Sequence, residues 1–230
     1  PQRSPKHAAP WPQPDDYLGG SIQRVDMQSG KVETVVAKCG EHGLRGPNDL
    51  VFDAHGGFWF TDHGVRLERS SDRTGVFYAA ADGSSIREVL FPLDAPNGVG
   101  LSPAGDRLYV AETHTGRVWA WDVPGPGVAQ GSGLLEPHGD LLCGLPGHQL
   151  LDSLAVDGDG WVCVGTLLNG GITAISPDGS RLEHHPADDL MVTNICFGGP
   201  EGRTAYATAS SSGRLLTAEW PRPGLRLAYP

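Results

Sequence analysis

A repeat runs along this chain and constrains its fold more than any other feature. Four segments align without gaps, and each begins with an amide or carboxylate side chain and reaches a glycine eight residues later. The segments are NDLVFDAHG from Asn48, NGVGLSPAG from Asn97, DSLAVDGDG from Asp152 and NICFGGPEG from Asn194. A second apolar run follows each glycine, so each repeat predicts a strand, a glycine turn and a second strand.

A third apolar run in each unit opens on a glycine. These glycines are Gly20, Gly75, Gly116, Gly171 and Gly213, at spacings of 55, 41, 55 and 42 residues. Fourth runs such as VETVVA, IREVLF and RLEHHP complete the units. Four-stranded units of about 40 to 55 residues are typical of β-propeller blades, whose radial stacking buries the apolar faces that isolated sheets would expose. The sequence therefore predicts an all-β propeller.

The strand count predicts how much of the propeller is present. The chain has five third strands but four first strands, so it enters partway through a blade. We expect about four and a half blades in a single domain over residues 15–230, after a proline-rich irregular lead-in over residues 1–14. An open ring leaves an unpaired edge, which folded proteins avoid. We therefore expect further sequence before Pro1 in the native polypeptide.

Composition narrows the partners and the compartment. The formal charge of 17 − 27 = −10 and the lack of a Lys/Arg stripe argue against nucleic acid. No apolar run approaches the roughly 18 residues that span a bilayer, and the polar start is not a signal peptide, although a removed leader stays open. Four scattered cysteines predict reduced thiols, so the expected location is cytoplasmic. The oligomeric state is left open.

The repeated polar position points to chemistry at the centre of the propeller. The first strand of each blade lines the channel, so Asn48, Asn97, Asp152 and Asn194 would meet at its mouth. Their oxygens are hard ligands that suit Ca²⁺, Mg²⁺ or Mn²⁺ and are acceptable to Zn²⁺. The alternative is that these residues only satisfy backbone groups at strand starts.

Several motifs together resemble the regucalcin/gluconolactonase family of six-bladed propellers. They are GPNDLVFDAHGGFWFTDHG, APNGVGLSPAGDRLYVAETHTGRVWAWD, LLDSLAVDGDG and the closing TNICFGGPEGRTAY, and the likeness runs from about Asp15 to the end. Members of that family hold one divalent metal at the channel mouth, and many hydrolyse lactones. The resemblance implies that Asn97 and Asp152 ligate the metal, Ca²⁺ being the first choice, and that Asn48 stands beside it as a further oxygen donor.

One ligand of the family has no counterpart in this sequence. That ligand is a glutamate in a Glu-Gly-Pro stretch of the first blade, and the sequence contains no such stretch. Glu41 lies in no matching motif. Because a carboxylate ligand is lost, we expect weaker binding of a divalent ion by this chain.

The implied reaction is metal-assisted hydrolysis of a sugar lactone or related cyclic ester. The ion polarises the carbonyl and lowers the pKa of a bound water, with Asp152 as both ligand and general base. Asn48, Asn194, His63 and Glu112 are candidate substrate contacts, although His63 and Glu112 follow second strands and could instead bond to loop backbone. The alternatives are a non-catalytic binding scaffold and a different reaction in the same channel, such as phosphotriester hydrolysis or strictosidine-synthase-like condensation.

Overall fold

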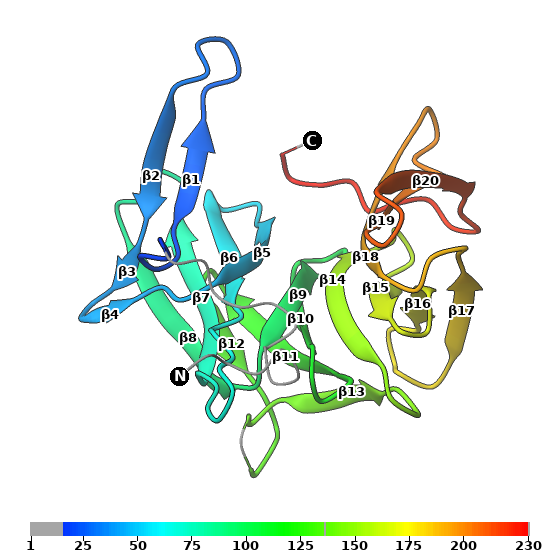
Figure 1. The fold of residues 1–230 in the computed structure, drawn as a ribbon, viewed down its shortest axis with the longest axis horizontal. Coiled ribbons are helices and arrows are strands. Elements are labelled where there is room, and N and C mark those ends of the chain that lie inside the picture. The colour runs from blue at the N-terminus through cyan, green and yellow to red at the C-terminus, as the bar shows by residue number, and fades with distance from the viewer. Residues whose placement is uncertain (1–15, 136, 230) are drawn as a thin grey trace, which may run out of the picture.

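The computed structural model describes residues 16–135 and 137–229, whose regular structure consists of β-strands without a helix. Its sheets are arranged around a common centre as an open arc (Figure 1). The predicted all-β, propeller-like architecture is confirmed, while the count of six blades stays a prediction. The lead-in predicted for residues 1–14 lies outside the described residues. Within those residues, no helical segment has the length and hydropathy needed to cross a membrane.

Four antiparallel sheets carry the predicted repeats, and we name each blade by its strands. The β5–β8 blade contains β5 (Pro47–Phe52), β6 (Gly57–Asp62), β7 (Thr74–Ala80) and β8 (Ile86–Leu93). The β9–β13 blade contains β9 (Pro96–Leu101), β10 (Arg107–Glu112), β11 (Arg117–Gly125), β12 (Val128–Gln130) and β13 (Asp140–Gly144). The β14–β17 blade contains β14 (Leu150–Val156), β15 (Val162–Leu167), β16 (Gly171–Ile175) and β17 (Leu182–Pro186). The β18–β20 sheet contains β18 (Val192–Gly198), β19 (Thr204–Ala209) and β20 (Arg214–Glu219).

The structure adds detail at the outer strands. β1 (Ile22–Val25) and β2 (Val32–Val36) pair as a two-stranded ribbon at the incomplete blade with which the sequence predicts that the chain begins. β3 (Lys38–Cys39) and β4 (His42–Gly43) form a short hairpin that the repeat did not predict. The single fourth strand expected after β11 is replaced by two shorter strands. These are β12 and β13, each of which pairs with a different part of β11.

The apolar core lies between neighbouring blades. Trp59 and Trp121 are buried in the cluster shared by the β5–β8 and β9–β13 blades, and three similar clusters fill the other interfaces. Burying one such large side chain contributes about 1.5–3 kcal/mol. Because both faces of an inner blade are covered, β6 and β15 are buried at every position, whereas the outer strand β17 alternates between exposed and half-buried residues.

The strand register brings the starts of the inner strands and the ends of the second strands to the same face of the arc. We call this face the mouth. Pro47 pairs with Asp62 and Pro96 pairs with Glu112, so the start of each inner strand lies beside the end of the second strand. The same register holds in the β14–β17 and β18–β20 sheets. The repeated polar position and the loops that follow β6, β10, β15 and β19 therefore all lie at the mouth.

The C-terminal segment, residues 220–229, lies on the face of the arc opposite the mouth. It leaves β20 and runs back toward β5 (Figure 1). Gly224 forms a β-bridge with Asp157, and the ring of Tyr229 lies 5.4 Å from the ring of Phe52. Asp157 follows β14 and Phe52 ends β5, so this segment connects blades on the face opposite the mouth.

Candidate functional site

Asn97 is the most firmly positioned member of the predicted site. Its side chain is buried, and Nδ2 donates a hydrogen bond to Thr113 Oγ1 at 3.1 Å. Its Oδ1 accepts from Ser153 Oγ at 3.5 Å, and its backbone carbonyl accepts from Thr61 Oγ1 at 2.6 Å. These contacts direct the amide oxygen of Asn97 toward the strand that carries Asp152.

The glycine that follows Asn97 explains how the two strands come so close. A Cβ atom on Gly98 would lie 2.6 Å from the Leu154 backbone nitrogen and 2.8 Å from the Asp152 carbonyl oxygen. Both obstacles are backbone atoms of β14, which cannot turn aside as a flexible side chain would. Glycine at this position therefore allows β9 to approach β14, which places Asn97 beside Asp152.

Asp152 presents a half-buried carboxylate at the mouth. Burial raises its pKa, while a hydrogen bond with the Asn97 side chain, another from the Ser153 backbone N–H at 3.0 Å, and the field of His63 act in the opposite direction. The net direction is upward because desolvation is the largest effect. A carboxylate in this setting would gain from a cation at the mouth.

Asn48 and Asn194 occupy the same position of the repeat as Asn97 and Asp152, but they are more exposed to solvent. Both side chains are exposed, and Oδ1 of Asn194 accepts a hydrogen bond from the backbone N–H of Ile195 at 2.7 Å. The β5 and β18 strands flank β9 and β14, so these two residues lie on either side of the Asn97–Asp152 pair. Their predicted roles in metal or substrate binding stay predictions.

Asp49 is a central residue that the repeat did not reveal. Its Oδ2 accepts from the backbone N–H groups of Val99 at 3.3 Å and Leu154 at 3.5 Å, and Oδ1 accepts from Leu50 at 2.9 Å. Burial raises its pKa to about 6, despite these hydrogen bonds. Asp49 stands one residue after the repeated position, so a search of that position alone overlooks it.

Two histidines lie on the rim of the mouth. The rings of His63 and His114 meet edge to face, with their centroids 5.9 Å apart. Burial lowers the pKa of His114, and Arg66 and His63 lower it further. The neighbouring Asp62 serves the loop backbone, because its carboxylate accepts from the N–H groups of Arg45, Gly46 and Gly64.

Glu112 is buried and its carboxylate is engaged within the blade. Oε1 accepts from the backbone N–H of Asp94 at 2.9 Å. Oε2 accepts from Thr115 Oγ1 at 2.7 Å and from Trp119 Nε1 at 2.9 Å. This arrangement favours the alternative in which Glu112 organises the loop, and its role as a substrate contact stays a prediction.

The oxygen donors at the mouth fit a hard divalent cation in kind. Asp152 supplies a carboxylate and Asn97 an amide carbonyl, and the exposed Asn48 can supply another. Ca²⁺ and Mg²⁺ prefer such oxygens. Among the described residues, no three His, Cys, Asp or Glu side chains are grouped so that they could hold a metal ion. The donor set is therefore one carboxylate with amides, which is compatible with a weakly held ion.

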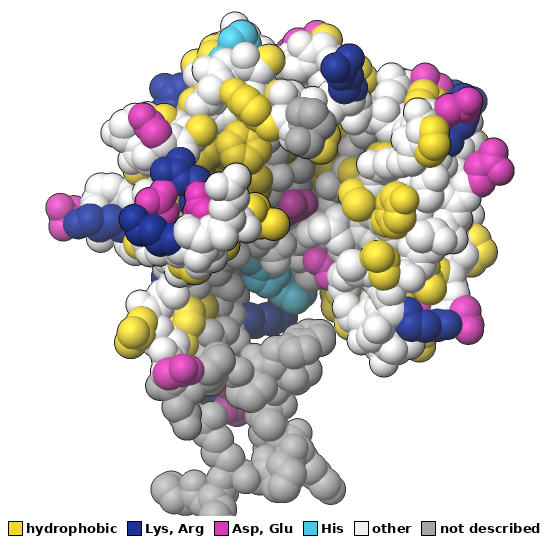
Figure 2. Space-filling model, turned by 90° about the horizontal axis from the view of Figure 1, so that it is seen from above, with side chains coloured by type: hydrophobic (Ala, Val, Ile, Leu, Met, Phe, Trp, Pro, Cys, Tyr) yellow, Lys and Arg dark blue, Asp and Glu magenta, His cyan; other side chains and the backbone are white. Residues whose placement is uncertain are grey.

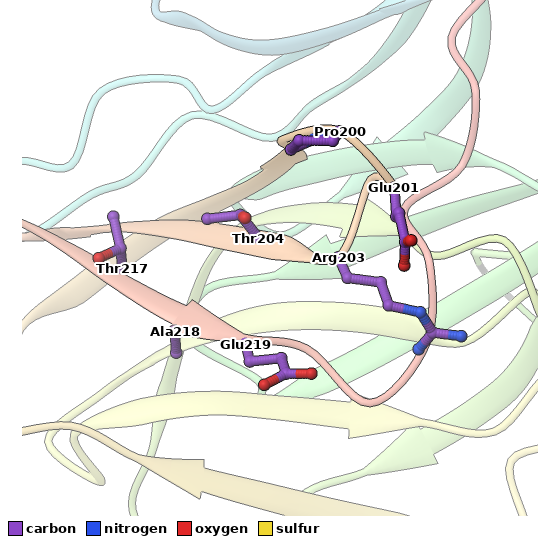
Figure 3. Close-up of a pocket in the computed structure, with 7 residues that line it drawn as sticks. All are labelled: Pro200, Glu201, Arg203, Thr204, Thr217, Ala218 and Glu219. Atoms are coloured by element: carbon purple, nitrogen blue, oxygen red, sulfur yellow. The ribbon is translucent and has the colours of Figure 1, made fainter.

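The surface at the centre of the arc is hollowed. Figure 2 shows histidine, basic and acidic side chains inside this hollow, between the two halves of the molecule. A separate hollow of about 590 Å³ lies where β18 ends, β19 begins and β20 ends, away from the mouth (Figure 3). It is lined by Pro200, Glu201, Arg203, Thr204, Thr217, Ala218 and Glu219. None of these is a residue of the predicted site.

Comparison with known proteins connects this arrangement to one family. The family described as the SMP-30/Gluconolactonase/LRE-like region matches residues 18–211. Lactonase drp35 from Staphylococcus saprophyticus is 32% identical over 173 residues, which cover 72% of this chain and 50% of that protein. A gluconolactonase from Zymomonas mobilis is 30% identical over 207 residues, which cover 83% of this chain and 55% of that protein. The chain thus spans about half the length of these curated relatives.

Solved structures share the fold. A gluconolactonase from Xanthomonas campestris superposes with a TM-score of 0.72 at 24% identity, covering 87% of this chain and 65% of that one. The calcium-binding protein regucalcin from Agrobacterium tumefaciens superposes with a TM-score of 0.70 at 16% identity, covering 90% of this chain and 74% of that one. At these identities the likeness shows the architecture.

Proposed function

This chain belongs to the SMP-30/Gluconolactonase/LRE-like family, and on that premise we propose that it hydrolyses lactones with the help of a divalent metal at the mouth. The relatives named lactonase and gluconolactonase support a cyclic ester as the substrate. The oxygen donors at the mouth, together with the calcium-binding neighbour, support Ca²⁺ as the first metal to test, ahead of Zn²⁺, Mg²⁺ and Mn²⁺. A cytoplasmic location stays a prediction.

The proposal assigns a role to each residue of the pair. A bound divalent cation polarises a lactone carbonyl and acidifies a water molecule. Asn97 and Asp152 would hold the ion through their side-chain oxygens, and Asn48 would contact the ion or the substrate. The free carboxylate oxygen of Asp152 would accept the proton of the attacking water. As the acyl carbon gains the water oxygen, its bond to the ring oxygen breaks, and Asp152 would return the proton to that oxygen, which leaves as a hydroxyl.

The observation that carries the proposal is the contact between Asn97 and Asp152. Two residues from different blades, at equivalent positions of the repeat, bring an amide and a carboxylate together at the mouth. Neither side chain pairs with a lysine or an arginine among the described residues. A non-catalytic scaffold would have little reason to keep this pairing.

The proposal is tested by calcium binding and by lactone turnover. In the purified protein, Asp152→Ala and Asn97→Ala should each weaken Ca²⁺ binding in calorimetry at least tenfold, because removal of one of few ligands leaves the ion poorly coordinated. Both variants should also reduce hydrolysis of glucono-1,5-lactone at least a hundredfold, measured by acid release. Asp82→Asn is the matched control, since Asp82 is an exposed carboxylate in the turn that joins β7 and β8, on the face opposite the mouth.

Two results would contradict the proposal. Unchanged turnover in Asp152→Ala would exclude both assigned roles of this carboxylate. A wild-type protein that binds neither Ca²⁺ nor any of the other three ions, and hydrolyses no member of a lactone panel, would favour the scaffold alternative.

A further inference from the structure

The rim of the mouth differs in chemistry from one side to the other. The loops that follow β6 and β10 contribute His63, Arg66 and His114. The loops that follow β15 and β19 contribute uncharged residues at the equivalent positions, namely Leu168, Asn169 and Ser210. Basic groups therefore lie on the side of the β5–β8 and β9–β13 blades, and the opposite side lacks charge at these positions.

The two histidines extend from the proposed metal pair toward the surface. His63 directly follows β6, which packs against β9, the strand that carries Asn97. The ring of His63 in turn contacts the ring of His114 edge to face at 5.9 Å, and both rings are half-buried. The histidines thus connect the site of hydrolysis to the rim.

Arg66 supplies a permanent charge in the same loop as His63. It is exposed in the loop between β6 and β7, where a β-bridge to Ser71 holds the backbone. Its field reaches His114, which also senses the acidic Asp94. Arg45 on the same blade is neutralised by Asp72 at 2.9 Å, whereas no carboxylate among the described residues forms an ion pair with Arg66.

We propose that His63, Arg66 and His114 form a subsite for an oxyanion, so that the preferred lactone carries an anionic group at the end away from its ester bond. Arginine and imidazole N–H groups are suited to carboxylate and phosphate oxygens, and a bidentate arginine contact also fixes orientation. The subsite would hold the charged end of the substrate on the basic side of the rim, while the ester lies over Asn97 and Asp152. This proposal rests on the lactone hydrolysis proposed above.

A pair of lactones that differ in one group tests the subsite. Glucaro-1,4-lactone carries a carboxylate where glucono-1,4-lactone carries a hydroxymethyl group, and both have the same five-membered ring. With Ca²⁺ present, the wild-type KM for the anionic lactone should be at least fivefold lower. Arg66→Gln should raise that KM about five- to tenfold, the loss expected for one charge-assisted hydrogen bond. The KM for the neutral lactone should change less than twofold.

Matched variants separate a specific contact from general electrostatics. Arg69→Gln makes the same change of charge three residues along the same exposed loop, and it should leave the selectivity between the two lactones unchanged. His114→Gln should also reduce the selectivity, because it removes a donor of the same subsite. Equal KM values for the two lactones in the wild type, or equal effects of the two arginine variants, would overturn the proposal.

A binding measurement keeps this test independent of catalysis. Calorimetry with the glucarate dianion on the calcium-loaded protein should show binding that Arg66→Gln weakens about five- to tenfold, even if neither lactone is hydrolysed. That outcome would support the subsite while removing the proposed reaction. Equal affinities of wild type and Arg66→Gln for glucarate would remove the subsite whatever the activity.

Discussion

The ion pair between Arg222 and Asp157 should be a principal stabilising contact of the C-terminal segment. Asp157 is completely buried, and its Oδ2 accepts from Arg222 Nε at 2.5 Å. Nη1 of Arg222 donates to Glu183 at 2.8 Å, and the guanidinium carbon lies 4.1 Å from the centre of the Trp161 ring. One side chain of the segment thus connects it to the end of β14, to β17 and to the start of β15.

The change Arg222→Met would keep much of the side-chain volume while removing the charge. Asp157 would retain its backbone donors, the N–H groups of Asp159 at 3.1 Å and Trp161 at 2.9 Å, but its carboxylate would stay buried without a cation. Removal of one partner from a buried pair costs about 3–5 kcal/mol. For a chain of this size such a loss corresponds to a fall in Tm of roughly 6–20 °C.

The assay is urea and thermal unfolding followed by tryptophan fluorescence, with Arg24→Met as the matched control. Arg24 pairs with Glu33 on the β1–β2 ribbon, but both side chains are about half exposed. An exposed pair contributes about 0–1 kcal/mol, so the control should lose at most that amount. Adding Asp157→Asn to Arg222→Met should recover part of the loss, because the unpaired buried charge is then removed.

The reasoning would be refuted if Arg222→Met lost no more stability than Arg24→Met. That result would mean that the segment contributes little to holding the blades together, whatever its contacts. A loss of about 3 kcal/mol without recovery in the double variant would instead assign the effect to packing against Trp161.

Two further predictions concern the centre of the arc. The pKa of Asp49 is raised to about 6 in the folded state, so the folded protein binds this proton more tightly than the unfolded chain does. The stabilisation that this gives is fully present below about pH 4 and is lost as the pH rises through 6. Urea unfolding without added metal should therefore show Asp49→Asn gaining about 1 kcal/mol relative to wild type between pH 5 and pH 8, and a constant difference would contradict the assignment. Gly98→Ala should lower the free energy of unfolding by about 1–3 kcal/mol and weaken Ca²⁺ binding, since its Cβ meets the backbone of β14. Gly144→Ala, with nothing within 4 Å of its Cβ, is the control and should change neither.

The sequence predicts most of the fold because the same pattern of residues recurs in each blade. Polar residue, apolar run and glycine recur in register, so one interpretation of NDLVFDAHG also accounts for the segments from Asn97, Asp152 and Asn194. The same pattern does not predict the division of the fourth strand into β12 and β13 or the path of residues 220–229. Both depend on contacts between segments distant in sequence, such as Asp157 with Arg222, which lie 65 residues apart.

The candidate site was predictable in part for a related reason. The structure places Asn97 and Asp152, which the family resemblance singles out, on adjacent strands. Position in the repeat identifies these two together with Asn48 and Asn194. It does not identify Asp49, because the buried setting of this carboxylate arises where three inner strands converge, between the backbone N–H groups of Val99 and Leu154. Nor does it show that the carboxylate of Glu112 is engaged by Asp94, Thr115 and Trp119. Each of these outcomes depends on neighbours that a linear pattern does not contain.

The four residues of the repeated position therefore share a register but not an environment. Asn97 and Asp152 each have an inner strand on both sides, since β9 lies between β5 and β14, and β14 lies between β9 and β18. Flanking strands exclude water, which desolvates Asp152 and would strengthen its interaction with the proposed cation. Asn48 and Asn194 lie at the two ends of this row and are exposed. The burial of a repeated residue in this protein thus depends on the strands beside it, and the metal site that we propose lies at the pair flanked on both sides.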